Sequence, residues 1–173
     1  MKWILIVVIA VIALLAAAWV IGLLLPKGHT AARTLHLKQP PEVVWGVISD
    51  AQAMPSWRLN VAKVERLADQ NGHPVWRETY KNGQALPLEM VEALPPKRLV
   101  GRIADPELPF GGTWTYEITP AEDGSAITIT ERGEVYNPIF RLVSRFMNQA
   151  GTIEEYLTYL AHKFGEEPSF RPI

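Results

Sequence analysis

Apolar residues recur every three or four positions through the last long segment of the chain, from Asn137 to Phe164. Their spacing predicts one amphipathic helix with a continuous apolar stripe, and Arg141 and Glu154 fall among the charged residues of its solvated side. Asn137 is a good N-cap, and Gly165 provides a stop. Such a helix, about seven turns long, needs a wide apolar surface to lie on. The stripe consists of Ile139, Leu142, Val143, Phe146, Ala150, Ile153, Leu157, Leu160 and Phe164.

The segments before this helix alternate between apolar and polar residues, which is typical of strands. A first strand is expected at 30–37, and two short helical segments follow, at 42–48 and around 54–57. Glycine- and proline-containing turns, of which Asn82-Gly83 is the strongest hairpin signal, separate the later strands. Their close spacing predicts antiparallel pairing. The six later strands are expected at 61–68, 74–81, 85–93, 97–104, 112–119 and 126–136.

The amino terminus has a different pattern, because residues 3–25 contain no charged side chain. As a helix, 23 residues cover ~34 Å, slightly more than the ~30 Å hydrocarbon core of a bilayer. A cleaved signal peptide has a shorter apolar region. Residues 16–18, three alanines, offer a cleavage site, but the apolar run continues to Leu25. We therefore expect a single-pass anchor in the cell membrane, formed by residues 1–25, with the side of the soluble domain undecided.

The predicted domain organisation continues with a linker at 26–29, a soluble domain at 30–165 and a tail at 166–173. Four linker residues reach only ~15 Å, so the domain is expected to sit close to the lipid headgroups. Beyond the apolar segment, 18 acidic residues face 16 basic ones, which argues against a nucleic-acid partner. The chain has no cysteine and no histidine pair with metal-ligand spacing, so neither a metal nor a cofactor is expected.

The order of strand, two short helices, six strands and a long helix resembles the helix-grip superfamily (SRPBCC). That superfamily holds the START lipid-transfer domains, the birch-pollen allergen family and the polyketide cyclase/dehydrase-like proteins. The residues that carry the resemblance are PPEVVWGVISD with PSW, then PPKRLV, FGGTWTYEITP and ITITERGEVYNPIFR. The resemblance covers residues 30–165 and is closest to small bacterial cyclase-like members. It implies an α+β fold in which a curved, seven-stranded antiparallel sheet wraps the C-terminal helix and leaves a cavity between them.

Strand alternation predicts which side chains face that cavity. In the strand at 112–119, Trp114 and Tyr116 share the apolar face, and the threonines lie on the solvated one. The alternative is that the aromatic residues simply fill a solid core. Pockets of this kind are mostly apolar, with a few placed polar groups. The predicted ligand-binding residues are Trp57, Trp76, Glu78, Tyr80, Met90, Arg102, Trp114, Tyr116, Glu131, Phe140 and Phe146.

Two carboxylates, Glu78 and Glu131, fall on the apolar face by alternation. A buried carboxylate needs a partner, and Arg102, flanked by Gly101 and Ile103, is the nearest plausible partner in kind. Glu78 and Glu131 are also the candidates for a catalytic acid or base. The alternative is that a bulge turns them outward or that they lie at the cavity mouth.

The sequence leaves three functions open. The first is a membrane-anchored binding or carrier module for a hydrophobic small molecule or lipid. The second is a cyclase-, dehydratase- or hydrolase-type enzyme that uses a cavity carboxylate. The third is a protein-interaction or stress-response module. The ligand and the oligomeric state are not determined by the sequence, and the same fold serves different functions.

Overall fold

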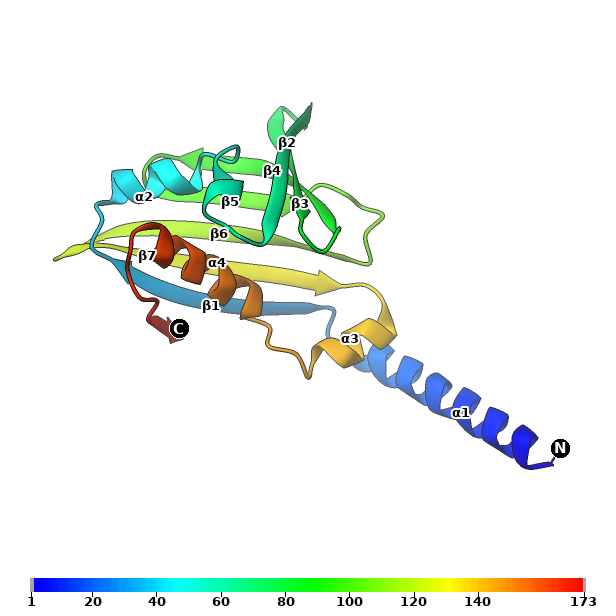
Figure 1. Cartoon of the computed structure of the whole chain (residues 1–173). Coiled ribbons are helices and arrows are strands. Elements are labelled where there is room, and N and C mark those ends of the chain that lie inside the picture. Colours follow the sequence, from blue (N-terminus) through cyan, green and yellow to red (C-terminus); the bar gives the residue numbers. More distant parts are fainter. Residues whose placement is uncertain (1, 173) are drawn as a thin grey trace.

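The structure, a computed structural model, describes residues 2–172 (Figure 1). A long helix projects from a strongly curved sheet, and the other helices lie against the domain or at its junction with that projection. The elements are α1 (Lys2–Leu24), β1 (Gly28–Leu37), α2 (Pro41–Ile48), a 3₁₀ turn (Met54–Ser56), β2 (Val61–Gln70), β3 (His73–Tyr80), β4 (Ala85–Leu94), β5 (Arg98–Ile103), β6 (Phe110–Ala121), β7 (Gly124–Val135), α3 (Pro138–Ser144), α4 (Gly151–Lys163) and β8 (Phe170–Pro172).

The predicted antiparallel sheet is confirmed, with strand order β2-β3-β4-β5-β6-β7-β1-β8. Each of the seven expected strands is present, and each starts and ends within a few residues of its predicted range. The β3–β4 turn contains Gly83 at φ 86°, a left-handed conformation that glycine adopts without strain. One strand was missed: β8 lies in the segment predicted as a tail and pairs with β1.

The core lies between the concave face of the sheet and two helices, α2 and α4. Leu157 and Leu160 of α4 are fully buried against residues such as Ile127 and Ile129 of β7. The predicted apolar stripe is therefore buried against the sheet in the second half of the segment, over α4. Its burial is the main contribution that holds α4 on the sheet, since each fully buried leucine or isoleucine contributes roughly 1.5–3 kcal/mol.

The prediction of one unbroken C-terminal helix was wrong. The chain leaves the helix after Ser144 and resumes it at Gly151, so α3 and α4 are separate elements. Asn148 accepts a hydrogen bond from the backbone N–H of Ala150 at 3.1 Å, which competes with the helical pattern, and glycine at position 151 is a poor helix former. The predicted N-cap is present, because Asn137 Oδ1 accepts from the N–H of Phe140 at 3.0 Å.

In the first half of this segment, helix α3 packs on α1 instead of the sheet, and the predicted stripe residues Ile139, Val143 and Phe146 remain exposed. Arg141, expected on the wet side, is buried, and its guanidinium donates to the carbonyl of Gly22 at 2.9 Å and to that of Leu25 at 3.2 Å. It also donates to the carbonyls of Val135 and Tyr136. A cation at a helix C-terminus satisfies carbonyls that have no partner within the helix. Arg141 therefore fixes the end of α1 to the domain.

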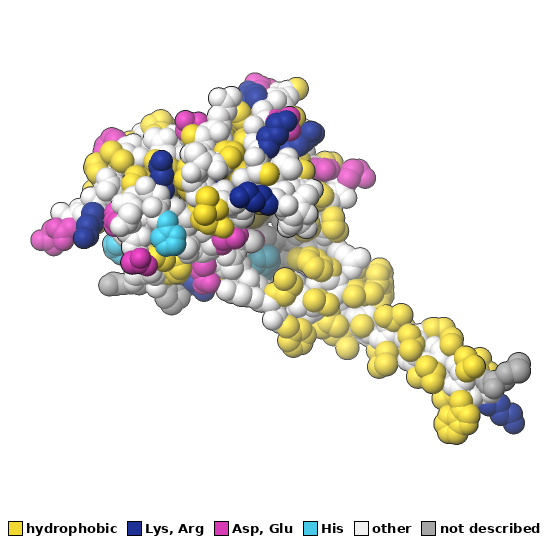
Figure 2. All heavy atoms as spheres, viewed as in Figure 1, with side chains coloured by type: hydrophobic (Ala, Val, Ile, Leu, Met, Phe, Trp, Pro, Cys, Tyr) yellow, Lys and Arg dark blue, Asp and Glu magenta, His cyan; other side chains and the backbone are white. Residues whose placement is uncertain are grey.

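Helix α1 is long and apolar enough to cross a membrane. Its large side chains are exposed along its length, and Figure 2 shows them as an apolar coat that continues onto the junction with the domain. Only Gly22 is buried, under α3, where an added Cβ would lie 2.0 Å from the carbonyl oxygen of Pro138. Three residues, 25–27, connect α1 to β1, so the domain lies close to the end of this helix.

Candidate functional site

A cavity of about 690 Å³ lies between the concave face of the sheet and the α3–α4 segment. This volume is within the range of pockets that hold small molecules. Its apolar walls come from the sheet and from both C-terminal helices. They include Leu86, Leu88, Ile103, Phe110, Trp114, Tyr116, Ile129, Val135, Phe140, Met147 and Ile153.

One polar cluster on the wall centres on Arg58, which follows the 3₁₀ turn. Arg58 Nη1 donates to Glu78 Oε2 at 2.9 Å, and the hydroxyl of Tyr80 donates to the same oxygen at 2.8 Å. The guanidinium carbon also lies 5.0 Å from the ring centroid of Tyr156 on α4, within cation–π range. Glu78 is only 4% exposed, so alternation correctly predicted that it turns inward. Its partner is Arg58, and the ion pair compensates for the loss of water around the carboxylate.

Arg58 and the tyrosines around it keep fixed charge states at neutral pH. Burial lowers the pKa of Arg58, but the combined attraction of Glu78 and the neighbouring tyrosines outweighs burial and leaves that pKa above its ordinary value. Burial, reinforced by the charge of Glu78, raises the pKa of Tyr80. Burial likewise raises the pKa values of Tyr116 and Tyr156. The cluster therefore presents neutral phenols and a permanent cation, which are hydrogen-bond donors, beside one carboxylate.

A second polar cluster surrounds Glu131 on β7. Its Oε2 accepts from the indole N–H of Trp114 at 2.9 Å and from the hydroxyl of Thr152 at 2.7 Å. On the other side, His29 Nε2 lies 3.4 Å from Oε1. The cluster thus joins three strands, β1, β6 and β7, to the first turn of α4. Two carboxylates on the wall of one apolar cavity are each held in a fixed orientation by hydrogen bonds.

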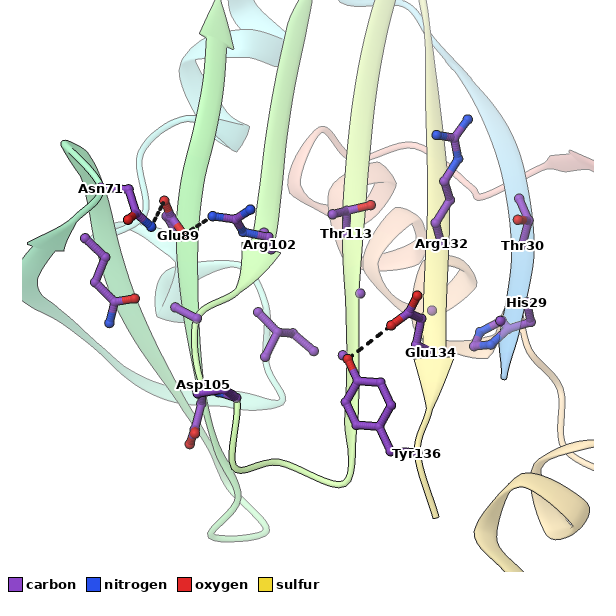
Figure 3. A pocket seen from close by; sticks show the side chains of 18 residues that line it. His29, Thr30, Asn71, Glu89, Arg102, Asp105, Thr113, Arg132, Glu134 and Tyr136 are labelled. Atoms are coloured by element: carbon purple, nitrogen blue, oxygen red, sulfur yellow. Dashed lines mark hydrogen bonds and ion pairs between the residues drawn. The ribbon is translucent and has the colours of Figure 1, made fainter. Parts of the chain in front are cut away.

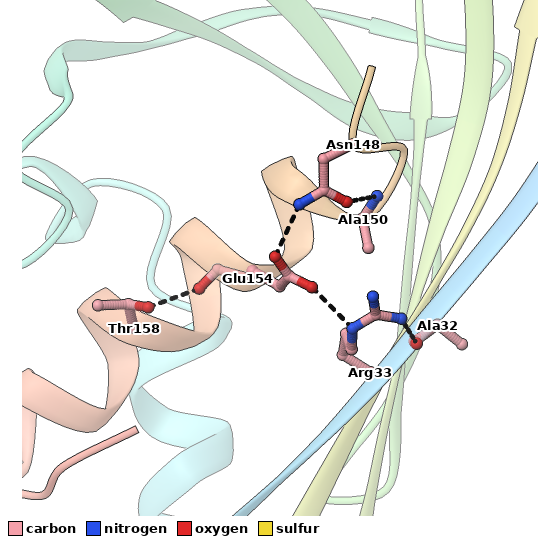
Figure 4. Close-up of polar contacts among 6 residues, drawn as sticks. All are labelled: Ala32, Arg33, Asn148, Ala150, Glu154 and Thr158. Atoms are coloured by element: carbon pink, nitrogen blue, oxygen red, sulfur yellow. Dashed lines mark hydrogen bonds and ion pairs between the residues drawn. The ribbon is translucent and has the colours of Figure 1, made fainter. Parts of the chain in front are cut away.

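Exposed lining residues gather in two segments, the β3–β4 turn at 81–84 and the stretch 140–148, and further exposed ones are Glu134, Thr152 and Glu155. These segments border the opening of the cavity. The second is tied down by Asn148, whose Nδ2 donates to Glu154 Oε2 at 2.9 Å (Figure 4). Arg33 on β1 in turn donates from Nε to Glu154 Oε1 at 2.8 Å. The break between α3 and α4 is therefore a fixed part of the cavity rim.

A separate groove of about 780 Å³ lies on the opposite, outer face of the sheet (Figure 3). Many of its lining residues are polar, and Glu89 is among them. Glu89 Oε2 accepts a hydrogen bond from Arg102 Nη2 at 2.7 Å, and its Oε1 lies 2.9 Å from His73 Nδ1. The prediction that Arg102 pairs with Glu78 or Glu131 was therefore wrong. Arg102 lies opposite Thr113 and Glu89 in the sheet, in a row whose side chains point away from α4.

Six of the eleven residues predicted to bind a ligand line the cavity: Glu78, Tyr80, Trp114, Tyr116, Glu131 and Phe140. The other five lie elsewhere. Trp57 is part of the core, packed edge-on against Tyr156 with ring centroids 5.3 Å apart. Met90 also packs against the core. Arg102 lines the outer groove.

The two remaining residues, Trp76 and Phe146, do not line the cavity either. Trp76 stays outside the cavity wall, and the guanidinium carbon of Arg66 covers its ring at 5.3 Å from the centroid. Phe146 is 86% exposed, because the chain has already left the helix at this position and no longer faces the sheet. Helical periodicity continues through the break, so the pattern alone places Phe146 on the inner stripe.

Sequence reasoning also missed residues that the structure brings to the cavity. Arg58 directly follows the PSW motif, but its contact with Glu78 spans 20 residues and leaves no local pattern. His29 was assigned to a linker, whereas β1 already begins at Gly28. Thr152 and Tyr156 fall outside the strict apolar stripe. Within the described part of the chain, no three His, Asp or Glu side chains lie together as a metal site.

Comparison with known proteins gives one family match. The family described as polyketide cyclase/dehydrase and lipid transport matches residues 29–164, which is most of the chain. A comparison with curated proteins found no match.

Solved structures share the fold. A START superfamily protein from Mycobacterium smegmatis is 18% identical, with a TM-score of 0.60, over 78% of this chain and 96% of its own. Norcoclaurine synthase from Thalictrum flavum is 13% identical, with a TM-score of 0.64, over 81% and 95%. An aromatase/cyclase from a Streptomyces species is 13% identical, with a TM-score of 0.60, over 79% and 93%. These similarities confirm the helix-grip fold that the sequence predicted.

Proposed function

Because the chain belongs to the polyketide cyclase/dehydrase and lipid transport family, we propose that it is a membrane-anchored binding or carrier module for a hydrophobic small molecule or lipid. The observation that carries this proposal is the cavity of about 690 Å³, whose walls are mainly apolar. An apolar ligand gains free energy there because it leaves water.

The polar clusters add a chemical preference. Arg58, Tyr80 and Tyr156 gather donors at one part of the wall, while Glu131 lies at another with its own donors. A molecule with a long apolar body and a polar end matches this distribution. Its polar end can form hydrogen bonds with these side chains in place of the hydrogen bonds to water that it loses on entering the cavity. The proposed ligand is therefore an amphiphile.

The anchoring part of the proposal is supported by α1. Its large apolar side chains are exposed all around the helix, which is the arrangement of a helix surrounded by lipid. Its last turns nevertheless belong to the fold, since Gly22 packs under α3. The intact mass of the protein extracted from membranes tests this part. The full chain retains residues 1–25, whereas a cleaved product lacks them and contradicts the anchor.

Ligand binding is tested by extracting the purified full chain and identifying bound lipid by mass spectrometry. Replacing Leu86 with Trp adds bulk to the cavity wall, and overpacking an occupied site costs roughly 1–3 kcal/mol. The expected loss of ligand affinity is therefore about 5- to 150-fold. Ala85→Trp is the matched control, because Ala85 is the exposed neighbour on the same strand. A chain that carries no ligand, or a Leu86 variant that binds as well as the control, contradicts the proposal.

A second candidate is an enzyme of the cyclase or dehydratase type, favoured by the position of Glu78 and Glu131 on the cavity wall. A carboxylate beside a bound substrate is suited to proton transfer. The two candidate functions predict different bound molecules in the variants Glu78→Gln and Glu131→Gln, which mass spectrometry distinguishes. A carrier yields the same ligand mass from wild type and variants. An enzyme accumulates unreacted substrate in the variants, with a different mass.

A further inference from the structure

Helix α3 packs against the end of α1 more extensively than against the sheet. The buried guanidinium of Arg141 binds carbonyls on both sides of the junction, at Gly22 and Leu25 in the amino-terminal segment and at Val135 and Tyr136 before α3. With α1 in a bilayer, these contacts fix α3 at the level where the helix leaves the lipid. The position of α3 relative to the membrane then follows from the fold and not from a flexible linker.

The face of α3 that is turned away from the domain is apolar. Val143 is 50% exposed and Phe146, in the turn that follows, is 86% exposed. Ile139 and Met147 are exposed beside them, and the same apolar coat is seen at the junction in Figure 2. In contact with water, such a cluster is unfavourable, and on soluble domains it marks an interaction surface. Here it continues the apolar surface of α1.

Basic residues flank this cluster, and a bilayer matches that pattern. Lys27, which follows α1, and Arg145, which follows α3, are both exposed. Long basic side chains near a membrane surface interact with lipid phosphates. Large apolar side chains at the headgroup boundary together with flanking cations are typical of interfacial membrane segments. The partner chemistry is therefore a lipid surface.

The same stretch borders the cavity. Phe140, Ser144 and Met147 line the cavity, while Val143 and Phe146 point outward. We propose that the α3 segment, residues 138–147, is embedded in the headgroup region of the bilayer that holds α1, and that the cavity opens toward this bilayer. The proposal rests on the proposed function, since it requires α1 to span a membrane. A ligand then passes between the lipid and the cavity without crossing water.

The absence of cysteine allows a direct test by site-directed spin labelling of the full chain in vesicles of phosphatidylcholine and phosphatidylglycerol. Single variants Leu14→Cys, Phe146→Cys and Leu94→Cys place labels on α1, on the α3 segment and on the β4–β5 turn. Leu94 is the matched control, because it is also an exposed apolar residue (55%) but lies at the other end of the strands. Collisions with oxygen report lipid, and collisions with a water-soluble nickel complex report water.

We expect labels at 14 and 146 to collide mainly with oxygen and the label at 94 mainly with nickel. If the labels at 146 and 94 are both accessible to nickel while the label at 14 is in lipid, the α3 segment is not embedded in the bilayer and this inference is overturned. The membrane anchor formed by α1 is then still supported. Nickel access at position 14 as well refutes the anchor itself. A second readout is the double variant Val143→Asp/Phe146→Asp, which should slow uptake of a fluorescent fatty acid from the vesicles. Unchanged uptake in a variant that still binds the fatty acid overturns the membrane-facing opening.

Discussion

The ion pair between Arg58 and Glu78 gives the sharpest prediction about the cavity. Its nitrogen and oxygen are 2.9 Å apart, and both side chains are about nine-tenths buried. Replacing Arg58 with Met leaves the carboxylate with Tyr80 as its remaining donor among the contacts seen here. Two unit charges about 4 Å apart attract by about 4 kcal/mol at an effective dielectric constant of 20. Removing one partner of a buried pair typically costs about 3–5 kcal/mol, so Arg58→Met should lower the free energy of unfolding by that amount.

The assay is guanidinium unfolding of the full chain in detergent, followed by tryptophan fluorescence. In thermal unfolding, the same loss of stability should lower the Tm of a chain of this size by roughly 6–20 °C. The matched control is Arg98→Met, whose pair with Glu117 is 2.7 Å long but exposed, so that the expected loss is under about 1 kcal/mol.

The double variant Arg58→Met/Glu78→Gln carries no charge at this buried site and should recover at least half of the loss, since replacing a whole buried pair is often neutral. Two results refute the reasoning. One is equal destabilisation by Arg58→Met and Arg98→Met. The other is a double variant whose loss equals the sum of the losses in the single variants, which would mean that the two groups are not coupled.

Three further predictions concern the outer face, the junction and the core. Arg102 and neighbouring donors lower the pKa of Glu89 to about 2 from its ordinary 4.5. The carboxylate therefore stabilises the fold above about pH 5 and loses this effect as the pH falls toward 2, and Glu89→Gln should flatten the pH dependence of unfolding in that window. Gly22→Val should detach α3 from α1 and increase proteolysis near residues 25–27, because the new Cβ would lie 2.0 Å from the carbonyl oxygen of Pro138. The control Gly46→Val, whose Cβ would have no atom within 4 Å, should leave the junction protected from the protease. Leu157→Ala should cost about 2–5 kcal/mol in the same unfolding assay, since Leu157 is fully buried, and a cost below about 1 kcal/mol would contradict its place in the core.

Much of the fold was predictable because its signals are local. Alternation along residues 112–119 and 126–136 identified β6 and β7 and the inner face that carries Trp114 and Glu131. Side chains in a strand point alternately to two sides, so a single apolar face is visible in the sequence itself. The Asn82-Gly83 turn, the N-cap at Asn137 and the apolar amino terminus are equally local.

The candidate site was less predictable, because its partners are distant along the chain. Nothing near Glu78 indicates that Arg58, rather than Arg102, provides its positive charge. That choice depends on strand register, which turns Arg102 to the outer face, and on the 3₁₀ turn, which brings Arg58 over the inner one. Apolar periodicity also continues across residues 145–150, so it contains no sign that the helix ends there.

The sequence by itself determined the strands β1 to β7, the helices α1 and α2, the apolar side of strands such as β6 and β7, and that residues 3–25 are suited to lipid. Only the tertiary structure decided where the last segment divides. Its second half covers the sheet, because Leu157 and Leu160 find an apolar surface there. Its first half joins α1, because the buried Arg141 satisfies carbonyls that the end of that helix leaves without partners. The physical reason is that an apolar periodicity specifies a face to be buried but not the surface that buries it.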